Sequence, residues 1–187
     1  MQTLHERCCG LDVHKQSISA CVRVTQGAEA VEEFAAFGTM SSDILRLGDW
    51  LEGHGVRHVA MESTGVYWKP IWNLLEERFE LMLVNAQHIK HVPGRKTDMM
   101  DCQWIAQLLA CGLLAPSFVP ERPQRELREL TRHRATLMQE KSRLANRIQK
   151  VLEDAGIKLA SVASDVLGAS GRAMLDQIVA GRTDPAE

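Results

Sequence analysis

Short apolar runs bounded by polar turn residues recur along the first half of the chain and predict β-strands. The predicted strands cover residues 8–13, 18–24, 30–37, 56–61 and 80–84. The polar segment 14–17 separates the first two runs, so it predicts a hairpin between them. The third run differs from the others because it carries the adjacent glutamates Glu32 and Glu33.

Apolar residues at helical spacing predict three amphipathic helices in the same region. The first covers residues 41–53, and the second covers 68–79 with Pro70 in its first turn. The third contains about fifteen residues and follows the basic loop 93–97. Because helices separate the later strands, the order predicts an α/β domain with a mixed sheet and helices on its faces.

Beyond residue 123 the apolar pattern becomes that of a coiled coil. Apolar residues alternate at intervals of three and four over nearly four heptads. They are Leu127, Leu130, Leu137, Leu144, Ile148 and Val151, with Arg134 and Lys141 at the two remaining positions. Two basic residues at core positions weaken an isolated dimer, so the pattern predicts a long helical arm that packs on a partner or on another helix of its own chain. One or two shorter helices are expected within residues 157–180.

These patterns divide the chain into an α/β domain at residues 1–116 and a helical arm with its linker at residues 117–187. Hydrophobic residues make up 45% and charged residues 25%, which is the balance of a globular protein. Polar Glu6, Arg7 and Asp12 stand where a signal peptide would be apolar, and no apolar run reaches the roughly 18 residues of a membrane span. We therefore expect a cytoplasmic protein without a membrane segment. The five cysteines form no C-x-x-C pair, which indicates reduced thiols.

The net charge of −2 conceals a strong segregation of charge along the chain. Residues 1–120 carry a net −4, residues 121–150 a net +5, and residues 151–187 a net −3. The basic middle segment coincides with the predicted helical arm. A Lys/Arg-rich helix can follow nucleic-acid phosphates, although a solvated helix face has the same composition.

Four acidic residues stand among apolar ones, where an uncompensated carboxylate costs several kcal/mol. Asp12 interrupts the first strand, Glu62 ends the fourth, and Asp98 and Asp101 fall at the third helix. Residues three apart share one face of a helix, so Asp98 and Asp101 could meet at one point. Asp12 and Glu62 could face the same point if their strands are neighbours.

Four carboxylates without accompanying Cys or His ligands suit Mg²⁺ or Mn²⁺. Such ions can clamp the attacking and leaving oxygens of a phosphoryl transfer, as in a nuclease or transposase. Each carboxylate alone also has a structural explanation. Asp98 and Asp101 suit a helix N-terminus, and Glu62 can accept a hydrogen bond from a turn. The combination favours the metal site.

Four ordered motifs carry a resemblance to a known family. They span residues 10–15 (GLDVHK), 61–68 (MESTGVYW), 84–85 (VN) and 96–101 (KTDMMD). With them the chain resembles the DEDD transposases of bacterial insertion sequences, which are related to site-specific DNA invertases. The resemblance implies an RNase H-like domain similar to the RuvC resolvase. It also implies metal-dependent DNA strand cleavage and transfer, catalysed at the metal ligands Asp12, Glu62, Asp98 and Asp101.

The same resemblance implies a structured non-coding guide RNA, DNA as substrate, and homo-oligomers formed through the helical arm. Cys102 departs from the small alanine usual in the family, a change that a helix tolerates. Family members continue into a second domain that supplies a serine proposed to link to DNA. This sequence stops before such a domain, so we expect a truncated copy or an N-terminal fragment.

Basic residues near the carboxylates and on the arm are candidates for contact with nucleic acid. They are Lys15, Lys90, Arg95, Lys96, Arg134, Lys141, Arg143 and Arg147. Two other functions stay open at this point. The chain could be a non-catalytic remnant that binds nucleic acid or dimerises, or a junction-resolving nuclease that acts alone.

Overall fold

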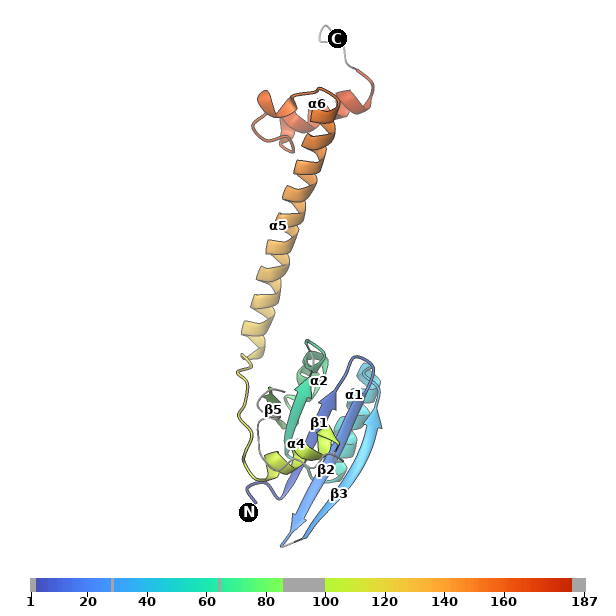
Figure 1. Cartoon of the computed structure of the whole chain (residues 1–187), viewed down its shortest axis with the longest axis vertical. Coiled ribbons are helices and arrows are strands. Elements are labelled where there is room, and N and C mark those ends of the chain that lie inside the picture. The colour runs from blue at the N-terminus through green and yellow to red at the C-terminus, as the bar shows by residue number, and fades with distance from the viewer. Residues whose placement is uncertain (1–2, 28, 64, 86–99, 183–187) are drawn as a thin grey trace. The chain divides into compact units, whose positions relative to one another are not determined.

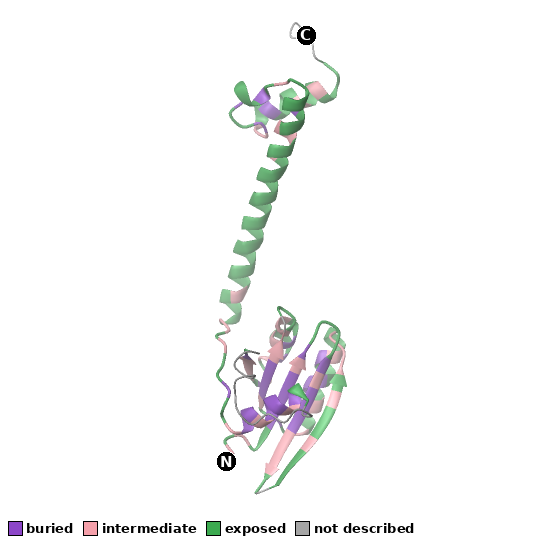
Figure 2. Ribbon diagram, in the orientation of Figure 1, coloured by how far each residue is buried: buried purple, intermediate pink, exposed green. Residues whose placement is uncertain are grey.

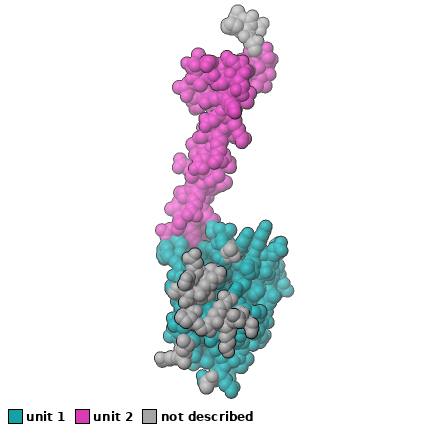
Figure 3. All heavy atoms as spheres, in the orientation of Figure 1, with its two compact units in different colours: residues 1–120 teal, residues 121–187 magenta. Residues whose placement is uncertain are grey.

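The structure is a computed structural model that describes residues 3–27, 29–63, 65–85 and 100–182. The chain forms two compact units, residues 1–120 and residues 121–187 (Figure 3). The two units have separate cores, so each is described by itself.

The described residues of the first unit form a mixed five-stranded sheet in the order β3-β2-β1-β4-β5 (Figure 1). Its strands are β1 (Arg7–Val13), β2 (Ile18–Gln26), β3 (Glu29–Phe37), β4 (His58–Ser63) and β5 (Glu80–Val84). β2 pairs antiparallel with both β1 and β3, whereas β4 runs parallel to β1 and to β5. Each strand predicted from the apolar pattern is therefore confirmed, β3 with its glutamates included.

Helices cover both faces of this sheet. Helices α1 (Ser41–Gly53) and α2 (Trp68–Leu75) lie on one face, where they pack on the alternate residues Cys9, Leu11 and Val13 of β1. Helix α4 (Asp101–Ala110) lies on the other face, where its apolar residues pack with Cys8 of β1. Successive residues of a strand point to opposite faces, so β1 divides its side chains between two apolar layers. The predicted mixed sheet with flanking helices is confirmed.

Gly10 of β1 allows helix α4 to approach the sheet closely. A Cβ atom at this position would lie 2.2 Å from the backbone oxygen of Cys102 and 2.4 Å from the backbone nitrogen of Ala106. Real Cβ atoms do not approach backbone so closely, so only glycine fits. The first turns of α4 are thereby held against the middle of β1.

The second unit is built on one long helix, α5 (Arg122–Asp154), of 33 residues. It is followed by a 3₁₀ turn, η1 (Leu159–Ser161), and helix α6 (Ala169–Val179). A small core at the end of α5 contains Leu152, Leu159, Ala163 and Val166. The predicted long helix is confirmed, and it extends beyond both ends of the heptad pattern.

The heptad positions of α5 are exposed along most of its length (Figure 2). Leu130 is 68% exposed and Val151 is 67% exposed. Contacts among the described residues of this unit therefore leave the apolar seam (Leu127, Leu130, Leu137, Leu144, Ile148 and Val151) largely uncovered. Among the described helices, none is both long enough and apolar enough to cross a membrane.

Candidate active site

Asp12 and Glu62 lie side by side on neighbouring strands. β1 and β4 are adjacent and parallel, and the register pairs Asp12 directly with Glu62. Paired residues of neighbouring strands point to the same face of a sheet. Ala60, two residues before Glu62, packs in the core under α4, so both carboxylates belong to the face that α4 covers. Both lie at the carboxyl ends of their strands.

Asp101 reaches the same end of the sheet from helix α4. This helix runs antiparallel to β1, because Ala110 accepts a backbone hydrogen bond from Leu4 at 2.7 Å while Cys102 lies against Gly10. Asp101 is the first residue of α4 and precedes Cys102 directly. The charges of Asp12 and Asp101 both act on the Cys102 thiol. The helix start is therefore close to the Asp12–Glu62 pair, and its positive end favours anions.

Asp12 is held in place by a neighbouring side chain. Its Oδ2 atom lies 3.1 Å from Nε2 of His14, and its side chain is only 19% exposed. Glu62 is half-buried and Asp101 is exposed. Hydrogen bonds compensate a half-buried polar group for lost water, and the His14 contact supplies one for Asp12.

The donors at this end of the sheet are carboxylate oxygens. Cys102 is the adjacent sulfur side chain, and burial raises the pKa of its thiol to about 11. Hard oxygen donors fit Mg²⁺ or Mn²⁺ rather than Zn²⁺. Within residues 3–27, 29–63, 65–85 and 100–182, no group of three His, Cys, Asp or Glu side chains is gathered closely enough to hold a metal ion, so Asp12, Glu62 and Asp101 do not form a complete metal site among these residues.

The third helix differs from its sequence-based prediction. It was expected to span about fifteen residues and to carry both Asp98 and Asp101 on one face. In the structure α4 has 10 residues and begins at Asp101, because the backbone of Met100 is extended (φ −63°, ψ 148°). Because α4 begins at Asp101, it does not carry Asp98 and Asp101 together on one face. Asp98 lies outside the described residues.

Comparison with known proteins identifies the family. A model of DEDD transposases, described as "Transposase", matches residues 9–157. The chain belongs to this transposase family. No curated protein matches it significantly. Among solved structures it is similar to RuvC of Thermus thermophilus at 13% sequence identity and a TM-score of 0.46, over 59% of this chain and 99% of that one.

The order and directions of the strands in the transposase chain agree with the RNase H-like fold that its motifs imply. Three antiparallel strands form one side of the sheet, and two strands parallel to β1 extend the other. In this arrangement the first and fourth strands are adjacent, which brings Asp12 beside Glu62. The fold accounts for the meeting of two motifs that are fifty residues apart.

The basic candidates fall into three groups. Lys15 is exposed in the β1–β2 hairpin, where its carbonyl accepts a hydrogen bond of 3.1 Å from the Thr39 hydroxyl. This hairpin directly follows Asp12, so Lys15 is near the carboxylates. Lys90, Arg95 and Lys96 lie outside the described residues. The arm residues Arg134, Lys141, Arg143 and Arg147 are exposed on α5.

Two residues next to the candidate site were not assigned a role from the sequence. Ser19 of β2 pairs with Asp12 on its other side, so it extends the row of polar residues across the sheet. Gly10 sets the approach of α4. A polar residue within a buried strand and a glycine inside a strand are the signals that could have identified them.

A polar network connects α4 to β3, the edge strand of the sheet. Gln103 donates a hydrogen bond of 2.6 Å to Glu32 of β3, and Arg23 of β2 forms an ion pair with the same carboxylate. Glu32 is therefore compensated on the face that α4 covers. This compensation explains why a strand with adjacent glutamates is stable. The hydrogen bond of Gln103 also holds α4 to the sheet two residues after Asp101.

Proposed function

We propose that this chain carries the catalytic part of a transposase that cleaves and transfers DNA strands at a metal site formed by Asp12, Glu62, Asp98 and Asp101. The observation that supports the proposal best is the direct pairing of Asp12 with Glu62, under a helix that begins with Asp101. Three carboxylates from separate motifs thereby reach one end of the sheet. The paired carboxylates of Asp12 and Glu62 repel each other, which is costly for folding unless a cation compensates them.

The chain's own residues prepare this site. His14 holds Oδ2 of Asp12, which leaves the second oxygen for a ligand. Gly10 and Gln103 fix the start of α4, so Asp101 keeps its place beside the strands. A bound Mg²⁺ or Mn²⁺ would supply the Lewis acid that polarises a scissile phosphate. The positive end of α4 favours the same anionic group.

The partners of this site follow from the family and from the two units. We propose that the substrate is DNA, that a structured non-coding RNA guides the protein to it, and that the protein acts in the cytoplasm. The N-terminal domain, residues 1–116, would hold the metal, and residues 117–187 would form the arm. The exposed seam of α5 supports assembly with a second copy of the chain, since a heptad seam is stable when another helix covers it.

A cleavage assay on this chain tests the catalytic proposal. We expect Mg²⁺-dependent cutting of nicked linear DNA by the wild type, and at least about a 100-fold slower rate for Asp12→Asn, because ligands of a catalytic metal supply several kcal/mol. Asp49→Asn is the matched control, since Asp49 lies on α1 against Arg78, on the opposite face of the sheet.

The outcomes separate the three candidate functions. Cutting of four-way DNA without any RNA would indicate a junction-resolving nuclease. Metal-independent binding without cutting would indicate a non-catalytic remnant. Equal rates for Asp12→Asn and the wild type would refute the assignment of the site.

A further inference from the structure

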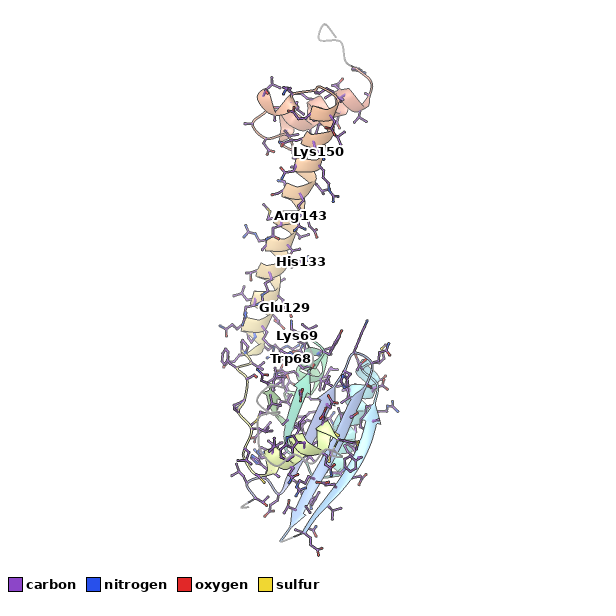
Figure 4. The ribbon with its side chains drawn as sticks, viewed as in Figure 1. Trp68, Lys69, Glu129, His133, Arg143 and Lys150 are labelled. Carbon is purple, nitrogen blue, oxygen red and sulfur yellow. The ribbon has the colours of Figure 1, made fainter. Side chains whose placement is uncertain are left out.

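Helix α5 presents two different faces. At 100° per residue, the side chains of its apolar seam fall within about 120° of one another around the helix axis. Arg132, Arg143, Arg147 and Lys150 fall within about 60° of one another, and their mean direction is about 130° away from the seam. These four residues are called the basic face. Arg143 and Lys150 mark its course along α5 (Figure 4).

The basic face carries no acidic residue along its length. Between residues 130 and 153, the one other residue in this arc is the uncharged Thr136. Glu129 and Asp154 fall in the arc just beyond its two ends. Glu140 lies between the basic face and the seam rather than on either. Within the described part of the chain, none of the four cations forms an ion pair. All four are exposed.

Unpaired cations aligned over such a length need an extended anionic partner. From residue 132 to residue 150 the helix rises about 27 Å. A surface charge pattern of this kind raises the local concentration of polyanions and fits a backbone of regularly spaced phosphates. Near its start α5 carries mixed charges instead, and there Arg122 pairs with Glu126.

We propose that the basic face of α5 binds the sugar–phosphate backbone of a nucleic-acid duplex while the seam stays available to a second helix. The two surfaces point in different directions, so a paired arm can hold a duplex on its outer side. Arg134 and Lys141 belong to the seam by this geometry and not to the phosphate contact. Arg132 and Lys150 take their place as contact residues.

This inference rests on the proposed role in nucleic-acid recombination, but it does not depend on the metal site. The test is therefore made in EDTA. The affinity of the chain for a fluorescent DNA duplex and for an RNA duplex of equal length is measured by anisotropy over a series of salt concentrations. Two variants of equal charge change are compared, R143Q/R147Q on the basic face and R134Q/K141Q in the seam.

Each phosphate contact contributes about 0.9 to the slope of log affinity against log salt on duplex DNA. We expect R143Q/R147Q to lower that slope by about 2 and to weaken binding at least about tenfold near 0.1 M salt. R134Q/K141Q should leave the slope unchanged. Glutamine is a good helix former, so circular dichroism should show equal helix content in both variants.

The comparison of the DNA duplex with the RNA duplex identifies the ligand. A reduced slope with only one of the two duplexes, or with both, supports the proposal and shows which nucleic acid is held. Wild-type slopes for R143Q/R147Q on both duplexes overturn it. An equal or greater loss of slope in R134Q/K141Q also overturns the proposal, because binding would then depend on the total charge of α5 and not on its basic face.

Discussion

Gly10 shows how one residue controls the geometry of the candidate site. Its missing side chain lets the backbone of α4 lie directly on β1, two residues before Asp12. The same contact brings Asp101 to the end of the sheet. A strand glycine usually weakens a sheet, so its presence here is explained by the close approach of another backbone.

Replacing Gly10 tests this contact. We expect Gly10→Ala to lower the free energy of unfolding by about 1–3 kcal/mol or more, because the new Cβ would overlap backbone atoms that cannot move singly. Urea denaturation should give a lower midpoint with an unchanged slope. Gly53→Ala provides the control, since a Cβ there meets nothing within 4 Å.

Gly53 is the last residue of α1, and alanine favours helix over glycine by up to about 1 kcal/mol. The control should therefore be as stable as the wild type or slightly more stable. Equal stability of Gly10→Ala and the wild type would show that α4 does not depend on this contact.

At the scale of elements, the apolar pattern predicts every described strand, because alternation and helical spacing are local properties of the sequence. Pairing is not local. The register of Asp12 with Glu62 depends on which strands become neighbours, and no spacing encodes it. The same holds for Glu32, whose compensating partner Gln103 lies 71 residues away.

The start of α4 was misplaced for a different reason. Acidic residues favour the first turn of any helix, and both Asp98 and Asp101 fit that position. The extended backbone at Met100 decides between them in the structure. The carboxylates could be chosen from the sequence because acids are rare among apolar residues, whereas their arrangement required the fold.

The apolar seam of α5 is largely exposed in the part of the chain that the structure describes. We expect Leu130→Glu/Leu144→Glu to abolish self-association of the chain in sedimentation experiments, because charges would replace two exposed leucines at heptad positions. Gln139→Glu/Asn146→Glu adds the same charge on the opposite side of the helix. That control should associate like the wild type.

If the leucine variant also sediments like the wild type, either the chain does not self-associate or it does so through another surface. Both results would contradict assembly through the seam. Glutamate is a good helix former, so loss of helix would not account for a change.

At the scale of the whole molecule, charge and chemistry are divided between the two units. The acidic first 120 residues contain the sheet on which Asp12 and Glu62 are paired, and the basic segment 121–150 forms most of α5. A transposase needs both a place for phosphate chemistry and a means of holding nucleic acid. We propose that the first unit performs the phosphate chemistry and that the second unit holds the nucleic acid.

The central claim is that carboxylates from separate motifs bind one divalent metal site. Titration with Mn²⁺, followed by the electron paramagnetic resonance signal of the free ion, tests it most directly. We predict that Asp12→Asn and Glu62→Gln each weaken Mn²⁺ binding at least about tenfold, while Asp49→Asn binds like the wild type. Unchanged Mn²⁺ affinity in both Asp12→Asn and Glu62→Gln would contradict the claim.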